Sequence, residues 1–249
     1  MISRNNFSNF NPQFKAYKHT IQYSNNRINR GDTCLFRFDL PFNDFVKFIY
    51  NKYKNVDKVE FIAHACSDGE EIFSVVSKMI DMLKNNAEKF FPIKAYDLEK
   101  EHILRAEKSN YTIESYERDA IKYYLGNNFF NYFLQEAPNN IIAKNILKSK
   151  VHFSQSNIMD DIQHIGLHNT VLLARNFWHY LTKKDIDKLA ITLGKKMDES
   201  STLVIGDYDK EYNIDKILNK NGIYETDVEN VFEKKMLYSK PNYFLFTLH

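Results

Sequence analysis

The chain has 249 residues, of which 43% are hydrophobic and 15% aromatic, and its formal net charge at pH 7 is +2. This length suffices for one large α/β domain, and mixed charges of both signs give no reason to expect a nucleic-acid or anionic-membrane surface. Two cysteines, Cys34 and Cys66, exclude a disulfide framework, and no apolar run approaches the roughly 18 residues that span a bilayer. We therefore expect a soluble protein of a reducing, cytoplasmic compartment.

The organisation along the chain predicts one domain with two additions. Residues 1–30 are polar and rich in Asn, and we interpret them as a loosely ordered arm. No repeat or low-complexity linker divides residues 31–249, which we interpret as a single domain. Within it, residues 111–150 crowd aromatic side chains, and we predict an insertion with its own small apolar cluster. The segments 141–147 and 151–155 could pair as a hairpin or form a helix followed by a strand.

The clearest local pattern is a strand, turn, helix and strand. An apolar run over 58–66 predicts a strand, and a polar turn with Gly69 follows it. Apolar residues at helical spacing predict a helix over 72–83, and a second apolar run over 90–96 stops at Asp97. This order is typical of a nucleotide-binding βαβ unit.

The remaining patterns extend this unit into a sheet covered by helices. We predict helices over 43–53, 99–108, 183–197 (with a capping box from Thr182 and Asp185) and 214–219, and strands over 170–174, 201–206, 228–234 and 243–248. Alternation of strands and helices indicates an α/β fold with a doubly wound, mostly parallel sheet. The last two strands could form a hairpin.

Ligands of open α/β sheets bind beyond the carboxyl ends of the strands, and polar residues mark three such ends. They are residues 66–70, Asp97 and the pair Arg175-Asn176. Asp97 could accept both hydroxyls of a ribose, or it could cap the helix that follows. The turn has one glycine and lacks the GxGxxG pattern, which disfavours a pyrophosphate. An adenosine without phosphates, such as S-adenosyl-L-methionine, fits better, with Glu70 either binding its ammonium group or lying in solvent.

Other chemistry has weaker support. His164 and His168 are four residues apart, but Gly166 lies between them and no acid or cysteine completes a metal site, so we expect no metal. Cys66 at the end of a strand is typical of a core residue rather than of a nucleophile.

Five segments occur in the order Thr33-x-x-Phe36-Arg37, Ala65-Cys66-Ser67-Asp68-Gly69-Glu70-Glu71-x-x-Ser74, Ala95-Tyr96-Asp97-Leu98, Val151-x-Phe153-x-x-x-Asn157-Ile158 and Arg175-Asn176-x-x-x-Tyr180-Leu181. In order and residue type they resemble the motifs of CheR-type S-adenosylmethionine-dependent methyltransferases. Each segment alone is weak, but together they are specific and cover about residues 31–206. The resemblance implies the class I methyltransferase fold, with a seven-stranded, mostly parallel sheet and a small subdomain at about 111–150.

The resemblance also implies a role for each matching residue. The methionine end of the cofactor would be held by Thr33, Arg37 and Glu70, the ribose hydroxyls by Asp97, and the adenine would be bordered by Asn157 and Ile158. Arg175 and Asn176 would close the pocket, Tyr180 would stand near the methyl group, and Ala65, Cys66, Ser67 and Leu98 complete the cofactor set. Arg37, with Tyr180, would also act on the acceptor side.

The acceptor is less defined than the cofactor. In the family, the methyl group goes to a glutamate side chain of a chemoreceptor, and such a carboxylate is ionised at neutral pH and needs no general base. Three substrate-side features depart from the family pattern: only about 30 residues precede Thr33, a glycine pair is replaced by Ser200-Ser201, and the "G-x-S-E" segment reads Gly206-Asp207-Tyr208-Asp209. The acceptor therefore stays open between a protein carboxylate and a small molecule.

Two other functions remain open at the level of sequence. One is a non-catalytic module that binds S-adenosylmethionine or its demethylated product, S-adenosylhomocysteine, and signals or scaffolds. The other is an enzyme that uses a dinucleotide. The sequence predicts no oligomeric state.

Overall fold

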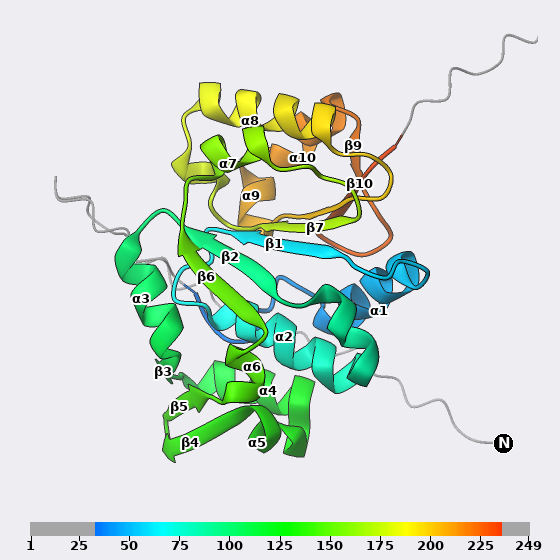
Figure 1. Ribbon diagram of the computed structural model, residues 1–249. Helices are drawn as coiled ribbons and strands as arrows, with labels where there is room; N and C mark the ends of the chain where they lie inside the picture. The colour runs from blue at the N-terminus through cyan, green and yellow to red at the C-terminus, as the bar shows by residue number, and fades with distance from the viewer. Residues whose placement is uncertain (1–32, 236–249) are drawn as a thin grey trace, which may run out of the picture. The chain divides into compact units, whose positions relative to one another are not determined.

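The computed structural model describes residues 33–235, and its centre is a seven-stranded sheet. The strands are β1 (Glu60–His64), β2 (Ile93–Asp97), β6 (Val151–Gln155), β7 (Thr170–Ala174), β8 (Thr202–Val204), β9 (Ile223–Glu225) and β10 (Val231–Lys234). They lie in the order β6-β2-β1-β7-β8-β10-β9 (Figure 1). The first five are parallel, and β10 is antiparallel to both of its neighbours. This arrangement confirms the predicted mostly parallel α/β sheet.

Helices cover both faces of this sheet, as a doubly wound fold requires (Figure 1). One face is covered by α1 (Phe42–Tyr53), α2 (Glu70–Leu83) and α3 (Lys100–Lys108). The other face is covered by α7 (Ile158–His164), α8 (Lys183–Lys196) and α10 (Ile214–Lys220). None of the helices within residues 33–235 has the length and apolar character needed to cross a membrane.

Several predicted boundaries differ from the observed ones for local reasons. β2 begins at Ile93 because residues Lys84–Phe90 form the 3₁₀ helix η1 and Pro92 has no amide hydrogen for the ladder. β10 begins at Val231, after Asn230, whose φ of 64° interrupts the extended chain. β9 pairs with β10, so the antiparallel pair forms earlier in the chain than expected. The predicted strand over 243–248 and the arm over 1–30 lie outside the described residues.

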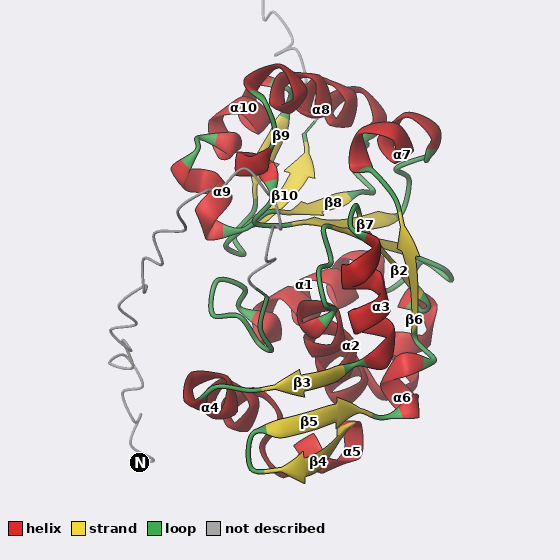
Figure 2. Ribbon diagram, turned by 90° about the vertical axis from the view of Figure 1, so that its left-hand side faces the viewer, coloured by secondary structure: helices red, strands yellow, loops and turns green. Residues whose placement is uncertain are grey.

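A second sheet forms between β2 and β6 in the chain. Its strands are β3 (Asn110–Thr112), β4 (Phe133–Ala137) and β5 (Asn140–Ala143), in the antiparallel order β3-β5-β4 (Figure 2). Four short helical segments complete the region: α4 (Ser115–Leu125), η2 (Gly126–Asn128), α5 (Phe129–Tyr132) and α6 (Asn145–Lys148). Because α6 precedes β6, and β6 pairs with β2, the hairpin alternative for 141–155 is wrong. The limits 111–150 of the insertion stay a prediction.

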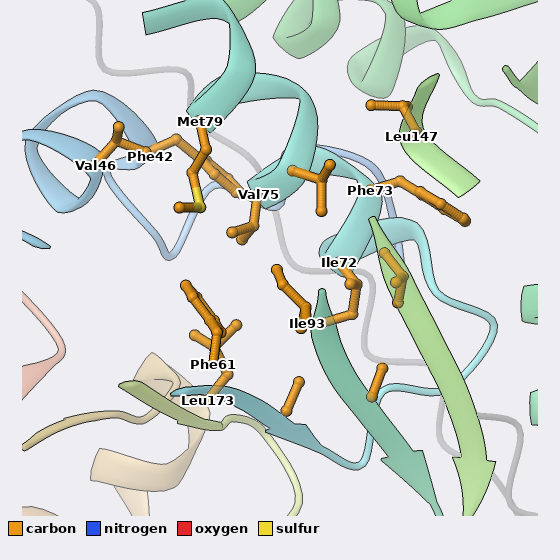
Figure 3. Close-up of a cluster of buried hydrophobic side chains, with 14 of the residues drawn as sticks. Phe42, Val46, Phe61, Ile72, Phe73, Val75, Met79, Ile93, Leu147 and Leu173 are labelled. Carbon is orange, nitrogen blue, oxygen red and sulfur yellow. The ribbon is translucent and has the colours of Figure 1, made fainter. Parts of the chain in front are cut away.

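The buried side chains of this region belong to the main core. Phe133, Ile141 and Leu147 fall in the same buried cluster as the side chains between α2 and the sheet, so the separate apolar cluster expected for the insertion is wrong. Figure 3 shows Phe73 of α2 beside Leu147, while Phe61, Ile93 and Leu173 of the sheet lie below α2. This shared packing fixes α2, whose first turn carries Glu70, relative to the ends of β1 and β2.

Candidate cofactor and acceptor site

The loop after β1 has an unusual backbone. Ala65, Ser67 and Gly69 have positive φ angles of 56°, 49° and 90°, a conformation that residues with a Cβ adopt only at an energetic cost. The end of β2 holds the loop in place: the Cys66 amide donates to the Tyr96 carbonyl at 3.0 Å, and the Ser67 amide donates to the Asp97 carboxylate at 2.8 Å. The loop is therefore shaped by β2 before any ligand binds.

Glycine is required at position 69 for two reasons. Its φ of 90° is unfavourable for other residues, and a Cβ there would lie 3.0 Å from the Phe153 ring and 3.1 Å from Ala106. Cys66 is buried in the core, and burial raises the pKa of its thiol well above the ordinary value. Cys66 therefore contributes its backbone, rather than a reactive thiol, to this loop.

Asp97 stands at the end of β2 and is buried. One carboxylate oxygen accepts from the Ser67 amide at 2.8 Å, and the other accepts from the Glu99 amide at 3.0 Å. The N-cap of α3 is Glu99, so Asp97 does not cap that helix as the alternative interpretation required. Each oxygen of a carboxylate can accept a second hydrogen bond, which leaves Asp97 able to bind two hydroxyl groups.

Glu70 lies in the first turn of α2 and is half-buried. Its Oε2 atom is buried and finds no hydrogen-bond partner within residues 33–235. Burial raises the pKa of this carboxyl to about 8, so that the neutral acid dominates at pH 7. The solvated acid considered above is therefore wrong, and a cation beside Glu70 would restore its charge.

The residues predicted to border an adenine lie next to Asp97. The Ser156 amide donates to the Asp97 carbonyl at 2.9 Å. Asn157 is the N-cap of α7, and its side-chain oxygen accepts from the Met159 amide at 2.9 Å. Ile158 is buried, whereas Leu98 is 58% exposed. The structure thus places Leu98 on the loop after β2 and Ile158 at the start of α7, which follows β6.

A buried ionic network occupies the end of β7, and sequence reasoning missed its central acid, Asp39. Arg175 donates to Asp39 at 2.6 Å and to Glu71 at 2.5 Å. Arg37 lies 3.5 Å from the same Asp39 carboxylate, and Asn176 donates to it at 3.0 Å. Asp39 therefore brings Arg37 together with the pair Arg175 and Asn176, which is far from it in the chain.

The charges of this network are strongly coupled. Burial opposes the ionisation of Asp39, but Arg175 and Arg37 outweigh it and hold the pKa of this carboxyl below its ordinary value. Burial likewise opposes the charge on Arg175, but Glu71 and Asp39 raise the pKa of the guanidinium above its ordinary value. Both groups are therefore charged in the folded protein, although they are almost wholly inaccessible to water.

Asp209 fixes the backbone beside this network. It is fully buried in α9 (Asp207–Glu211) and accepts from the amides of Asn176 at 2.6 Å, Gly206 at 2.9 Å and Trp178 at 3.2 Å. Burial raises the pKa of Asp209 to about 6. Residues 206–209 depart from the family pattern, and that pattern does not reveal the partners of Asp209.

The remaining predicted residues lie at the edge of the site. Thr33 is half-buried at the start of the described chain. Tyr180 ends the 3₁₀ helix η3 (Trp178–Tyr180) and is 53% exposed. Its ring centroid lies 3.8 Å from that of His179, and the His179 ring also packs against the rings of Tyr208 and Tyr212. The sequence analysis singled out Tyr180 of this exposed aromatic group, but it did not predict that Tyr208 and Tyr212 lie beside it.

Two hollows of the surface involve other parts of the chain. One, of about 560 Å³, is lined by residues that include Arg118, Phe133 and Lys144, and the other, of about 510 Å³, by residues that include Lys47 and Glu229. No predicted site residue lines either hollow. The candidate site is therefore defined by its polar groups at the strand ends rather than by the volume of these hollows.

A comparison with protein families decides the assignment. A family model described as "CheR methyltransferase, SAM binding domain" matches residues 31–222, well over half of the chain. The chain belongs to this family. It is therefore a methyltransferase that uses S-adenosylmethionine, which answers the two alternatives left open by the sequence. No curated protein matches the chain.

Several solved structures with similar folds are described as methyltransferases. The methyltransferase domain of bacterial CtHen1-C is 12% identical, with 77% of this chain and 95% of that chain covered and a TM-score of 0.39. The magnesium protoporphyrin IX methyltransferase ChlM from Synechocystis PCC 6803 is 13% identical, with 77% and 74% covered and a TM-score of 0.38. The plantazolicin methyltransferase BpumL is 16% identical, with 66% and 47% covered and a TM-score of 0.36. We base no argument about the site on these likenesses.

The residues of this CheR-family chain fit the cofactor. Three buried polar atoms without a partner in the described part of the chain belong to predicted cofactor residues: Glu70 Oε2, Arg175 Nε and Asn176 Oδ1. Buried polar atoms are nearly always hydrogen-bonded, so an unpaired acid and unpaired amide and guanidinium groups suit a polar ligand. The amino-acid end of S-adenosylmethionine offers an ammonium and a carboxylate for such groups.

Proposed function

We propose that this methyltransferase binds S-adenosylmethionine across the ends of β1 and β2 and transfers its methyl group to an oxygen atom beside Arg37 and Tyr180. The observation that carries the proposal is the buried, unpaired carboxyl of Glu70. An ammonium group of the cofactor would replace the water that this carboxyl has lost and would restore its charge.

The other roles follow from the positions of the side chains. Asp97 accepts the two ribose hydroxyls with the acceptor sites that the loop amides leave unused. Leu98, Asn157 and Ile158 border the adenine, and the backbone of residues 65–67 passes beneath the cofactor. Thr33 and Arg37 bind the methionine end, while Arg175 and Asn176 close the pocket around it.

The reaction requires the protein mainly to position the acceptor next to the cofactor. When bound, the cofactor supplies a sulfonium whose methyl group is already activated. The chain contributes by orienting the acceptor oxygen in line with that group, which can supply much of the rate acceleration. Arg37 orients an anionic or polar acceptor, and Tyr180 shapes the path of the methyl group. A protein carboxylate, as in the glutamate methyltransferases that the chain resembles, and a hydroxyl of a small molecule both satisfy this description.

Calorimetry with S-adenosylmethionine and S-adenosylhomocysteine tests the cofactor site. Asp97→Ala removes the acceptor for the ribose hydroxyls, so we expect the binding free energy to weaken by roughly 1.5–3 kcal/mol, as for hydrogen bonds to a charged group. Asp160→Ala is the matched control, because Asp160 is an exposed acid on the neighbouring helix α7. Equal affinities of wild type and Asp97→Ala would remove Asp97 from the site.

Transfer of a labelled methyl group identifies the class of acceptor. Wild-type protein incubated with labelled cofactor and a cell lysate should place the label either on protein, as a base-labile ester, or in the small-molecule fraction. An absence of transfer, together with tight cofactor binding, would contradict the proposed catalytic function.

A further inference from the structure

Four rings gather where β7 and β8 end, on the acceptor side of the site. His179 and Tyr180 come from η3, and Tyr208 and Tyr212 come from α9 and the residue that follows it. The His179 ring centroid lies 3.8 Å from Tyr180, 4.7 Å from Tyr208 and 5.5 Å from Tyr212. The three tyrosines are 53%, 42% and 46% exposed, and the rings of Tyr208 and Tyr212 also pack against each other, with centroids 5.4 Å apart.

His179 lies at the centre of this aromatic group and is only half-buried. Its Nδ1 atom is buried and has no hydrogen-bond partner among residues 33–235. Burial, followed by the positive charge of Arg37, lowers the pKa of the imidazole below its ordinary value. The groups that face it are Arg37 from the segment before α1, Tyr180 beside it, and Tyr208 and Tyr212 from the α9 segment. The lowered pKa favours the neutral imidazole, in which one of the two ring nitrogens is an acceptor.

The base, the cation and the exposed rings described above suit some classes of methyl acceptor better than others. A carboxylate is ionised at neutral pH and needs neither a base nor a stacking surface. An ammonium acceptor would be repelled by Arg37. A phenolic hydroxyl, with an ordinary pKa of about 10, must lose a proton in order to attack, and its ring can stack on exposed tyrosines. Arg37 would also stabilise the oxyanion that develops.

We propose that the acceptor is an aromatic hydroxyl whose ring packs against Tyr208 and Tyr212, and that His179 is the general base for its methylation. This inference rests on the proposed cofactor site and narrows its acceptor class. The proton of the hydroxyl moves to His179 as the oxygen forms a bond to the methyl carbon. The carbon–sulfur bond breaks, its electron pair stays on sulfur, and the sulfonium becomes a neutral thioether. The imidazolium then releases its proton to solvent.

The test compares two phenols of different acidity. Wild-type protein and labelled S-adenosylmethionine are incubated at pH 8 with 4-methylphenol, which is protonated, or with 4-nitrophenol, which is largely ionised. General bases contribute roughly 10²–10⁴-fold, so we expect His179→Gln to lower the rate on 4-methylphenol by at least about 100-fold. The rate on 4-nitrophenol should fall less than about tenfold, because that acceptor has already lost its proton.

Controls separate a loss of the base from other losses. His164→Gln, an exposed histidine of α7, should leave both rates unchanged. Calorimetry with S-adenosylhomocysteine should give the same affinity for wild type and His179→Gln, which shows that the fold and the cofactor site are intact. A tyrosine-containing tripeptide, assayed in parallel, distinguishes a tyrosine side chain from a free phenol as the source of the hydroxyl.

Each result has one meaning. Equal loss on both phenols, or no loss on either, would overturn the role of His179. Cofactor binding without methylation of any aromatic hydroxyl, or with the label in a base-labile glutamate ester, would overturn the acceptor class and leave the proposed cofactor site standing. Failure to bind the cofactor would instead overturn the proposed function.

Discussion

The ends of β1 and β2 and the ends of β7 and β8 are built by different means. At β1 and β2 the backbone does most of the shaping: a loop with three positive φ angles is held by main-chain bonds and by Asp97, which lies 30 residues from its partner Ser67. At β7 and β8, charged side chains that are 104 and 136 residues apart meet around Arg175. The first arrangement leaves an acid without a partner, and the second neutralises its acids internally. The first region thus leaves a whole carboxyl oxygen for a ligand, whereas the second pairs its acids and leaves only Arg175 Nε and Asn176 Oδ1 without a partner in the described part of the chain.

The largest expected effect comes from breaking the network at β7. Arg175→Met leaves Asp39 and Glu71 buried without their cation, so the free energy of unfolding should fall by roughly 3–5 kcal/mol, as measured by urea denaturation. Lys210→Met is the matched control, since Lys210 pairs with Glu225 near the surface and should cost about 0–1 kcal/mol. If the two variants were equally stable, the network would not support the fold.

A smaller effect is expected from crowding the same region. A Cβ at Gly206 would lie 2.0 Å from the side-chain oxygen of Asn176, so Gly206→Ala must displace that amide and should lower the free energy of unfolding by roughly 1–3 kcal/mol. At Gly166 a Cβ would meet nothing within 4 Å. Thermal unfolding of Gly206→Ala and Gly166→Ala compares them directly. A melting temperature for Gly206→Ala as high as that of Gly166→Ala would show that the strand end tolerates rearrangement.

The smallest expected effect is on the pH dependence of the free energy of unfolding, through Glu70 beside the end of β1. The pKa of Glu70 is raised from 4.5 to about 8 on folding, so the folded chain binds a proton that the unfolded chain releases. The free energy of unfolding of the ligand-free protein should therefore fall as the pH rises from about 4.5 to 8. Above about pH 7, where Asp209 with its pKa of about 6 has mostly titrated, Glu70→Gln should flatten this slope. Denaturation at several pH values measures it.

An exposed acid provides the control for this slope. Glu101→Gln on α3 changes the same charge at an exposed position and should keep the wild-type slope. Cofactor binding adds a second readout, because an ammonium beside Glu70 favours the ionised acid. The affinity of wild type for S-adenosylmethionine should rise as the pH approaches 8, and Glu70→Gln should remove this rise. Parallel slopes in wild type and Glu70→Gln would mean that Glu70 is ionised throughout.

The contrast between the two regions also explains what could be predicted from the sequence. β7 was predicted with its observed limits, and of the predicted capping box the N-cap Thr182 is present, because apolar runs and caps are local patterns. The place of Asp97 at the end of β2 also followed from an apolar run that stops there, while its role in the site stays a prediction. The role of Asp39 could not be predicted, because its partners are distant in the chain and buried acids have no sequence period. Short elements such as α9 and β9 have too few residues to show periodicity.

One side chain near the end of the described chain, that of Asn230, bonds to a residue near its beginning. The side-chain amide of Asn230, next to β10, donates to the Asp39 carbonyl at 2.8 Å and to Asp207 at 2.7 Å. Proteins are synthesised from the N-terminus, so the β1–β2 unit leaves the ribosome well before Asn230 does. During translation the loop after β1 can therefore form before Asn230 is available to bond to Asp39. The nascent chain should therefore form the loop after β1 first and complete the network around Asp39 only after Asn230 has been synthesised.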